Sequence, residues 1–93
     1  MSNKILVFTM DGCGHCKSLK NRLEENSIPY MDIEITDNQH IWNQVVEQTG
    51  HSLLPTIFIK KEDSDDGPVF IPGRDYQSED EIVKIIKNQI KKG

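Results

Sequence analysis

The sequence predicts an α/β domain with a mixed four-stranded sheet and helices on both faces, in the order β-α-β-α-β-β-α. Two strand-like segments near the N-terminus flank an amphipathic segment, which is typical of parallel strands joined by a right-handed crossover helix. Two later strand-like segments are separated by a polar stretch that contains Asp66-Gly67, which is typical of an antiparallel hairpin. Amphipathic segments between the two pairs and at the C-terminal end supply the remaining helices.

The first half of the chain holds two predicted strands and one predicted helix. Residues 5–8 form a continuous apolar run, which is typical of a strand buried on both faces. A helix is predicted from Gly14, and it ends before Pro29 because the residue before a proline disfavours helical angles. The core-facing residues of this helix are Cys16, Leu19 and Leu23. Residues 30–35 alternate in polarity, which predicts the second strand.

Capping-box patterns open the two remaining predicted helices. The first box is residues 36–39, starting at Thr36, and Gly50 suits the C-terminal cap of that helix. Its apolar side carries Ile41, Trp42, Val45, Val46 and Thr49. The second box is residues 78–81, starting at Ser78, and residues 56–59 and 69–71 predict the strands of the hairpin. The core face of the last helix is predicted to be Ile82, Val83, Ile85, Ile86 and Ile90.

Length and charge narrow the classes of function. The chain has 93 residues, a net charge of −4 and 28% charged residues. This length suits one domain over residues 1–93. Phosphate binding needs a concentrated basic face, so the composition argues against nucleic acid as a partner. The apolar run near the start is too short for a signal-peptide core or a membrane span, so we expect a cytoplasmic protein without a membrane partner.

Both cysteines of the chain lie in one motif, Cys13-Gly14-His15-Cys16. Structural disulfides are rare in the reducing cytosol, and two intervening residues close too small a loop to restrain the unfolded chain. The motif follows a strand and opens a helix, whose unpaired N–H groups and partial positive charge stabilise a thiolate. This position predicts Cys13 as the nucleophile toward a substrate disulfide and Cys16 as the resolving thiol.

His15, between the two cysteines, has two interpretations. When protonated, it favours the thiolate and makes the cysteine pair more oxidising; otherwise it is an exposed side chain without a tuning role. Metal binding is the other chemistry open to a C-x-x-C motif. Zinc usually takes four ligands, and His40 and His51 do not form a second pair at the usual spacing. No metal is therefore expected, although an iron–sulfur cluster shared by two subunits remains an alternative.

The redox motif after the first strand, a proline before the third and a glycine after the fourth together resemble the glutaredoxins of the thioredoxin superfamily, across nearly the whole chain. Residues 49–59, T-G-H-S-L-L-P-T-I-F-I, are similar to the family segment T-G-x-x-T-V-P-x-I-F-I. The resemblance implies a thioredoxin-like fold in which Pro55 is a cis-proline beside the reactive disulfide. It also implies that the backbone of Leu54 pairs with a peptide or glutathione substrate as an added strand.

Residues 72–75, P-G-R-D, fall where glutaredoxins have G-G-x-D. The resemblance implies that loop amides and the following helix start hold the γ-glutamyl carboxylate of glutathione. The implied glutathione contacts are Leu54, Pro55, Gly73, Arg74 and Asp75. The implied function is that of a dithiol glutaredoxin, which reduces protein disulfides or glutathione mixed disulfides with glutathione as reductant. Ribonucleotide reductase is an expected partner, and the protein is expected to be a monomer.

Departures from the family pattern keep other interpretations open. The C-G-H-C motif followed by Lys17 is similar to protein disulfide isomerases, whereas glutaredoxins usually have C-P-Y-C. Met10 replaces a lysine, and His51 and Ser52 replace basic or amide residues, which in the family help to hold the glycine carboxylate of glutathione. These replacements favour a thioredoxin-like redoxin that is recycled by a flavoprotein reductase. A non-catalytic metal or iron–sulfur carrier is the second alternative.

Overall fold

A computed structural model of the chain describes residues 4–61 and 67–92, with side chains as far as residue 90. The elements are β1 (Lys4–Thr9), α1 (Gly14–Glu25), β2 (Met31–Glu34), α2 (Gln39–Thr49), β3 (Thr56–Lys60), β4 (Val69–Phe70) and α3 (Glu79–Lys92). The predicted order of strands and helices is therefore confirmed. No helix within these described ranges is both long and apolar enough to cross a membrane.

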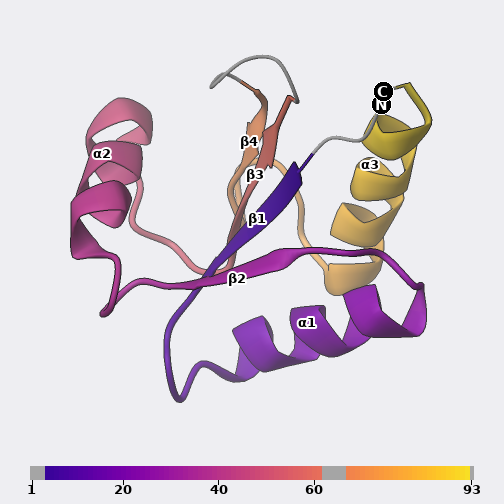
Figure 1. Cartoon of the computed structure of the whole chain (residues 1–93), viewed down its shortest axis with the longest axis horizontal. Coiled ribbons are helices and arrows are strands. Elements are labelled where there is room, and N and C mark those ends of the chain that lie inside the picture. Colours follow the sequence, from indigo (N-terminus) through magenta and orange to yellow (C-terminus); the bar gives the residue numbers. More distant parts are fainter. Residues whose placement is uncertain (1–3, 62–66, 93) are drawn as a thin grey trace.

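The four strands form one mixed sheet in the order β2-β1-β3-β4 (Figure 1). Central strand β1 pairs in parallel with β2 and antiparallel with β3, so that Val7 lies between Asp32 and Ile57. The hairpin strands β3 and β4 pair antiparallel, with Phe58 opposite Val69. The predicted parallel pair and the predicted hairpin are both confirmed, while Asp66 of the predicted turn lies outside the described residues.

Helices cover both faces of the sheet (Figure 1). The main core lies between the sheet and helices α1 and α3, and its fully buried side chains include Val7, Leu19, Leu23, Ile57, Ile59, Ile82 and Ile86. Helix α2 covers the opposite face, where the rings of Trp42 and Phe8 pack with their centroids 5.5 Å apart. Each large apolar side chain buried in this way contributes about 1.5–3 kcal/mol to folding. The core therefore fixes the end of β1 against the start of α1, where the cysteine motif lies.

Helix α1 ends earlier than the position of Pro29 requires. Ser27 adopts a left-handed conformation with φ of 56°. The N–H of Ser27 bonds to Glu24 O at 3.1 Å, and the N–H of Ile28 bonds to Leu23 O at 2.9 Å. These two bonds form a Schellman motif, in which Ile28 joins Leu23 in the core. Burial of Ile28 therefore ends the helix at Glu25, before the proline can act.

The predicted capping box at Thr36 is wrong. Helix α2 begins at Gln39, and its cap residue Asn38 forms no capping hydrogen bond with its side chain. The hydroxyl of Thr36 instead donates to the carboxylate of Glu34, the last residue of β2. Glu34 therefore competes with the start of the helix for the Thr36 side chain. The helix also exposes Ile41, which was predicted on its apolar side, and buries only Trp42.

The C-terminal cap of α2 and the start of the last helix agree more closely with the predictions from the sequence. Gly50 has a φ of 74° at the end of α2, as its predicted cap role requires. The second capping box is present in part: Ser78 Oγ accepts from Glu81 N at 3.2 Å, while the Glu81 carboxylate accepts from Gln77 N at 2.7 Å. Ile90, predicted on the core face of α3, is exposed. It lies one turn beyond Ile86, the last fully buried residue of this helix, so core contact ends before the helix does.

Candidate active site

Cys13 is the N-terminal cap of helix α1. Its backbone is extended, with φ of −84° and ψ of 111°, and its Sγ accepts a hydrogen bond from the N–H of Cys16 at 3.4 Å. The turn before it is closed by a bond from Cys13 N to Met10 O at 3.1 Å. Gly12 enters this turn with a φ of 83°, a conformation that glycine adopts without strain. The chain thus places the sulfur of a thiol directly against the N–H groups and partial positive charge of a helix start.

Cys16 lies in a different environment, although it is only three residues further on. Its side chain is 2% exposed, whereas Cys13 is half-buried, and both are free thiols. Burial, and then the hydrogen bond with Cys13, raise the pKa of the Cys16 thiol to about 12. The predicted asymmetry is therefore present in the geometry: one thiol faces the surface, and the other lies beneath it and stays protonated at neutral pH.

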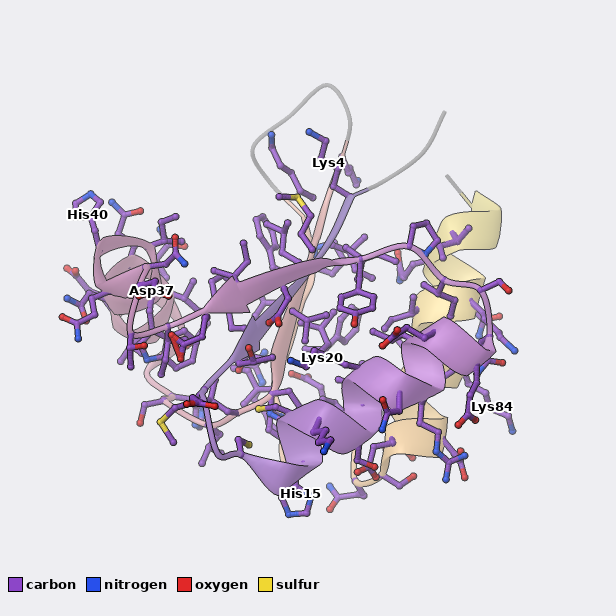
Figure 2. The ribbon with its side chains drawn as sticks, turned by 60° about the horizontal axis from the view of Figure 1, so that its bottom comes forward. Lys4, His15, Lys20, Asp37, His40 and Lys84 are labelled. Atoms are coloured by element: carbon purple, nitrogen blue, oxygen red, sulfur yellow. The ribbon has the colours of Figure 1, made fainter. Side chains whose placement is uncertain are left out.

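A pocket of about 750 Å³ opens on the β2 side of the motif. Both cysteines line it together with Met10, Asp11, Lys17, Lys20, Asp32, Glu34, Thr36 and Asp37. Lys20 reaches from α1 to Asp32 on β2, with 2.9 Å between Nζ and Oδ2 (Figure 2). This hydrogen bond raises the pKa of Lys20. Partial burial acts to raise the pKa of Asp32, but the hydrogen bonds from Thr9 and Lys20 outweigh it, so the pKa of Asp32 is lowered. The two groups therefore form a charged pair beside the buried thiol.

The Glu34 carboxylate ties the loop before Cys13 to the connection between β2 and α2. One oxygen accepts from Asp11 N at 3.2 Å, and the other accepts from Thr36 N at 3.0 Å and Asp37 N at 3.3 Å. The hydrogen bond from the Thr36 side chain is the largest cause of a lowered Glu34 pKa. A single carboxylate thus positions two loops that border the larger pocket.

A second pocket, of about 220 Å³, lies on the other side of the motif. It is lined by His15, Leu54, Pro55, Pro72, Tyr76, Gln77, Ser78 and Glu79. The Leu54-Pro55 peptide is cis, as the family resemblance implies. The hydroxyl of the buried Tyr76 donates to the carbonyl oxygen of Pro55, and burial raises the pKa of this phenol. Tyr76 therefore supports the cis-proline from beneath, a role that nothing in the local sequence indicated.

His15 projects from the start of α1 (Figure 2). Its side chain is 85% exposed, and its Nδ1 lies 3.9 Å from Glu79 Oε1 at the start of α3. The imidazole therefore faces a carboxylate across the smaller pocket.

Gly73, Arg74 and Asp75 line neither of the two pockets. Their N–H groups bond within their own loop, from Gly73 to Tyr76 O at 2.8 Å and from Arg74 and Asp75 to Ile71 O at 3.2 and 2.8 Å. The Asp75 carboxylate also closes this loop, since it accepts from Ile71 N at 2.8 Å and from Arg74 Nε at 2.9 Å. The structure thus brings Leu54 and Pro55 to the motif but not the predicted loop residues.

Residues 76–79 line the smaller pocket beside the cis-proline, while the predicted glutathione contacts of residues 73–75 stay a prediction. The capping box at Ser78 located a helix start here, and this signal was sufficient to identify Gln77, Ser78 and Glu79 as candidates. Within residues 4–61 and 67–92, no three or more His, Cys, Asp or Glu side chains gather in a way that could hold a metal ion.

The chain is similar to glutaredoxins in sequence. A glutaredoxin family model matches residues 5–63. The glutaredoxins of Ricinus communis and Vernicia fordii are each 31% identical over 61 residues, which is 62% of this chain and 60% and 59% of the two relatives. The chain thus spans about 60% of the length of these curated relatives.

Solved structures extend the similarity to the fold. The crystal structure of a buckwheat glutaredoxin–glutathione complex is 28% identical, with a TM-score of 0.54 over 61% of this chain and 55% of that chain. A thioredoxin-2 described as a component of malaria parasite protein secretion machinery is 16% identical, with a TM-score of 0.54 over 95% of this chain and 85% of that chain. The second likeness bears on the fold alone and confirms a thioredoxin-like fold over nearly the whole chain. Since the family model covers more than half of the chain, the chain belongs to the glutaredoxin family of the thioredoxin superfamily.

Proposed function

We propose that this protein is a dithiol oxidoreductase that reduces protein disulfides or glutathione mixed disulfides through Cys13 and Cys16. One observation carries the proposal: an accessible thiol caps helix α1 and accepts a hydrogen bond from the N–H of a second, buried cysteine at 3.4 Å. A helix start favours the thiolate of the first cysteine. Burial protects the second from external reagents, so it reacts with Cys13 Sγ once that sulfur is bound to the substrate.

The reaction takes place in two exchange steps. The Cys13 thiolate attacks one sulfur of the substrate disulfide, a bond forms between the two sulfurs, and the other substrate sulfur leaves as a thiolate. Cys16 then loses its proton and attacks Cys13 Sγ, which releases the second substrate sulfur and leaves a Cys13–Cys16 disulfide. The substrate gains two electrons, and the cysteine pair loses two. Two thiols of a reductant, such as two glutathione molecules, restore the dithiol and become a disulfide.

The electrostatics support this order of steps. In the dithiol, burial is the largest cause of the raised pKa of Cys16, the hydrogen bond and the charge of Cys13 add to it, and the Met10 backbone and Lys20 lower it. A mixed disulfide at Cys13 removes the Cys13 contributions and leaves that of Lys20. The Cys16 thiol therefore becomes easier to deprotonate at the point in the cycle at which it must attack.

Glutathione is the proposed reductant, in line with the buckwheat relative whose structure was solved with glutathione. The supporting feature of this chain is Leu54, whose backbone N–H and C=O have no hydrogen-bond partner among the described residues. These groups are available to an extended substrate. Reductive recycling of this kind suits a reducing cytoplasm and a client such as ribonucleotide reductase.

The proposed function is tested by the reduction of a small glutathione mixed disulfide, coupled to NADPH through glutathione reductase. We expect turnover by the wild type, complete loss in Cys13→Ser, and partial or full retention in Cys16→Ser, since glutathione can release the mixed disulfide at Cys13. Turnover that persists in Cys13→Ser contradicts the proposed role of this residue.

A second candidate is a redoxin recycled by a flavoprotein reductase. Two observations favour it: the exposed Met10 stands where glutaredoxins have a lysine, and the amides of residues 73–75 are bonded within their own loop. An assay with NADPH and thioredoxin reductase in place of glutathione separates the candidates. NADPH consumption in this assay together with none in the glutathione assay supports the redoxin.

A further inference from the structure

We propose that the surface around the cysteine motif selects disulfides flanked by cationic residues, so that a basic peptide or protein segment reacts faster than an anionic disulfide such as that of glutathione. This inference rests on the proposed function and specifies its substrate class. Two observations support it: the charges on both sides of the cysteine motif, and the unpaired backbone groups of Leu54 next to the cis-proline.

The larger pocket has an excess of negative charge. Of its two lysines, Lys20 is neutralised by Asp32 at 2.9 Å. Three carboxylates, those of Asp11, Glu34 and Asp37, then remain against the ammonium group of Lys17. The carboxylates of Asp11 and Asp37 form no hydrogen bond or ion pair with any described residue, so their charges remain available to a partner.

The side of the smaller pocket is also acidic. The first turn of α3 carries Glu79, Asp80 and Glu81, which oppose the attraction of a helix start for anions. Arg22 is bound to Asp80 at 2.6 Å, and Arg74 is bound to Asp75 at 2.9 Å. Among the residues that line this pocket, only His15, 3.9 Å from Glu79, has a basic side chain. Glutathione has two carboxylates and one ammonium group. Neither pocket has two unpaired lysine or arginine side chains, one for each of these carboxylates.

The same region suits an extended peptide. The backbone N–H and C=O of Leu54 are unpaired among the described residues, as required for an added strand. Two large apolar side chains of this region are exposed: Leu53, the neighbour of Leu54 in the chain, is 49% exposed, and Met10, which lines the larger pocket, is 44% exposed. A peptide can cover these side chains while its lysine or arginine residues approach Asp11, Asp37 and Glu79. Glutathione is too small to cover them, and its negative charge opposes an approach to these carboxylates.

The test is a single-turnover reaction of the fully reduced protein with two synthetic peptides. Each peptide contains one disulfide, and the two differ only in that lysines or glutamates flank the cysteines. Acid quenching and mass spectrometry give the second-order rate constant for oxidation of the protein. Each constant is divided by that of the uncharged thiol 2-mercaptoethanol with the same peptide, which removes differences in intrinsic disulfide reactivity. We expect the normalised constant of the lysine peptide to be about tenfold larger at low salt, and the two to converge near ~1 M salt.

Charge-neutralising variants locate the effect. In the double variant Asp11→Asn, Asp37→Asn we expect the lysine-to-glutamate ratio to fall severalfold, with a slower lysine peptide and a faster glutamate peptide. The control double variant Glu25→Gln, Glu47→Gln also removes two negative charges, from exposed sites on α1 and α2 that line neither pocket, and the ratio should stay at the wild-type value.

The outcomes separate this inference from the proposed function. Equal normalised constants for the two peptides, or a ratio that the double variant leaves unchanged, overturn the charge selection while the thiol chemistry stands. If neither peptide oxidises the protein, or if oxidation does not need Cys13, the proposed function is overturned and the inference with it.

Discussion

At the scale of single residues, one turn of helix separates two thiols with opposite properties. Cys13 caps α1 and is open to solvent on one side, while Cys16 is 2% exposed and has a pKa raised to about 12 by burial and by its neighbour. The spacing of the motif specified this difference, because a residue three positions into a helix faces the core when the helix packs on a sheet. Two predictions follow from the environment of Cys16.

The first concerns alkylation of the reduced, folded protein. With iodoacetamide at pH 7, we expect Cys13 to react at least about tenfold faster than Cys16, since the thiolate is the reactive form and only Cys13 is accessible. Peptide mapping by mass spectrometry measures both sites, and unfolding in urea serves as the control, in which the two rates should approach each other. Equal labelling in the folded state contradicts the account.

The second concerns stability against pH. The Cys16 pKa is raised from 9.0 in the unfolded chain to about 12 in the fold, so the folded protein holds a proton that the unfolded chain loses. The stabilisation is fully present below pH 9 and is lost as the pH rises toward 12. Urea titrations from pH 8 to 10.5 should show the free energy of unfolding decreasing in the wild type, with a smaller decrease in Cys16→Ala. Parallel curves for the two proteins contradict the assignment.

At the scale of elements, the sequence located every helix and strand but not all of their ends. Gly50 and Ser78 cap helices as predicted, because those signals act within a few residues of the chain. The capping box at Thr36 failed because Glu34, at the end of β2, binds the same hydroxyl. The end of α1 depends on burial of Ile28 against the core, which local propensity does not register. Tertiary contacts therefore determine the start of α2 and the end of α1, which the sequence predicted incorrectly.

The Schellman motif at the end of α1 gives a third prediction. Ser27 occupies the left-handed position with φ of 56°, which costs a residue with a Cβ about 1–2 kcal/mol. Ser27→Gly should raise the free energy of unfolding by about 0.5–1 kcal/mol after the entropy of glycine is subtracted. The same change inside the helix, Ser18→Gly, is the matched control and should destabilise the protein. Urea unfolding measures both, and a destabilising Ser27→Gly is inconsistent with the motif.

The Glu34 carboxylate, which connects two loops, gives a fourth prediction. In Glu34→Ala the N–H groups of Asp11 and Thr36 lose their acceptor, so their hydrogen exchange should accelerate and the attack by Cys13 should slow severalfold. Glu24→Gln, which alters an exposed carboxylate bonded to Tyr30 on the far part of α1, is the control and should change neither quantity. Unchanged exchange at Asp11 and Thr36 means that Glu34 does not hold the loop.

At the scale of the whole molecule, the sheet brings three distant segments to one end. The motif follows β1, the cis Leu54-Pro55 peptide precedes β3, and the start of α3 closes the smaller pocket. The sequence identified the cysteines and the proline, because each has a local signal. The start of α3 has only a capping-box signal in the sequence, and the predicted glutathione contacts of residues 73–75, in a loop closed by the Asp75 carboxylate on Ile71 and Arg74, stay a prediction. Only the assembled fold reveals Tyr76 beneath the proline.

The charges around this end are also a property of the whole molecule. Asp11 and Asp37 come from loops at the ends of β1 and β2, and Glu79 comes from α3. Asp11 and Asp37 line the larger pocket with Cys13, and Glu79 lines the smaller pocket with His15, so the fold gathers carboxylates from separate segments on both sides of the motif. Substrate choice is therefore expected to depend on the tertiary structure, whereas the thiol chemistry follows from four consecutive residues.

The most direct test of the central claim is to trap the mixed disulfide. Reduced Cys16→Ser and reduced Cys13→Ser are each mixed with a peptide disulfide, quenched with acid and mapped by mass spectrometry. The account predicts that Cys16→Ser accumulates one peptide bound to Cys13, that Cys13→Ser accumulates none, and that the wild type proceeds to the Cys13–Cys16 disulfide. A stable adduct at Cys16, or none at Cys13, would contradict the assignment of Cys13 as the nucleophile.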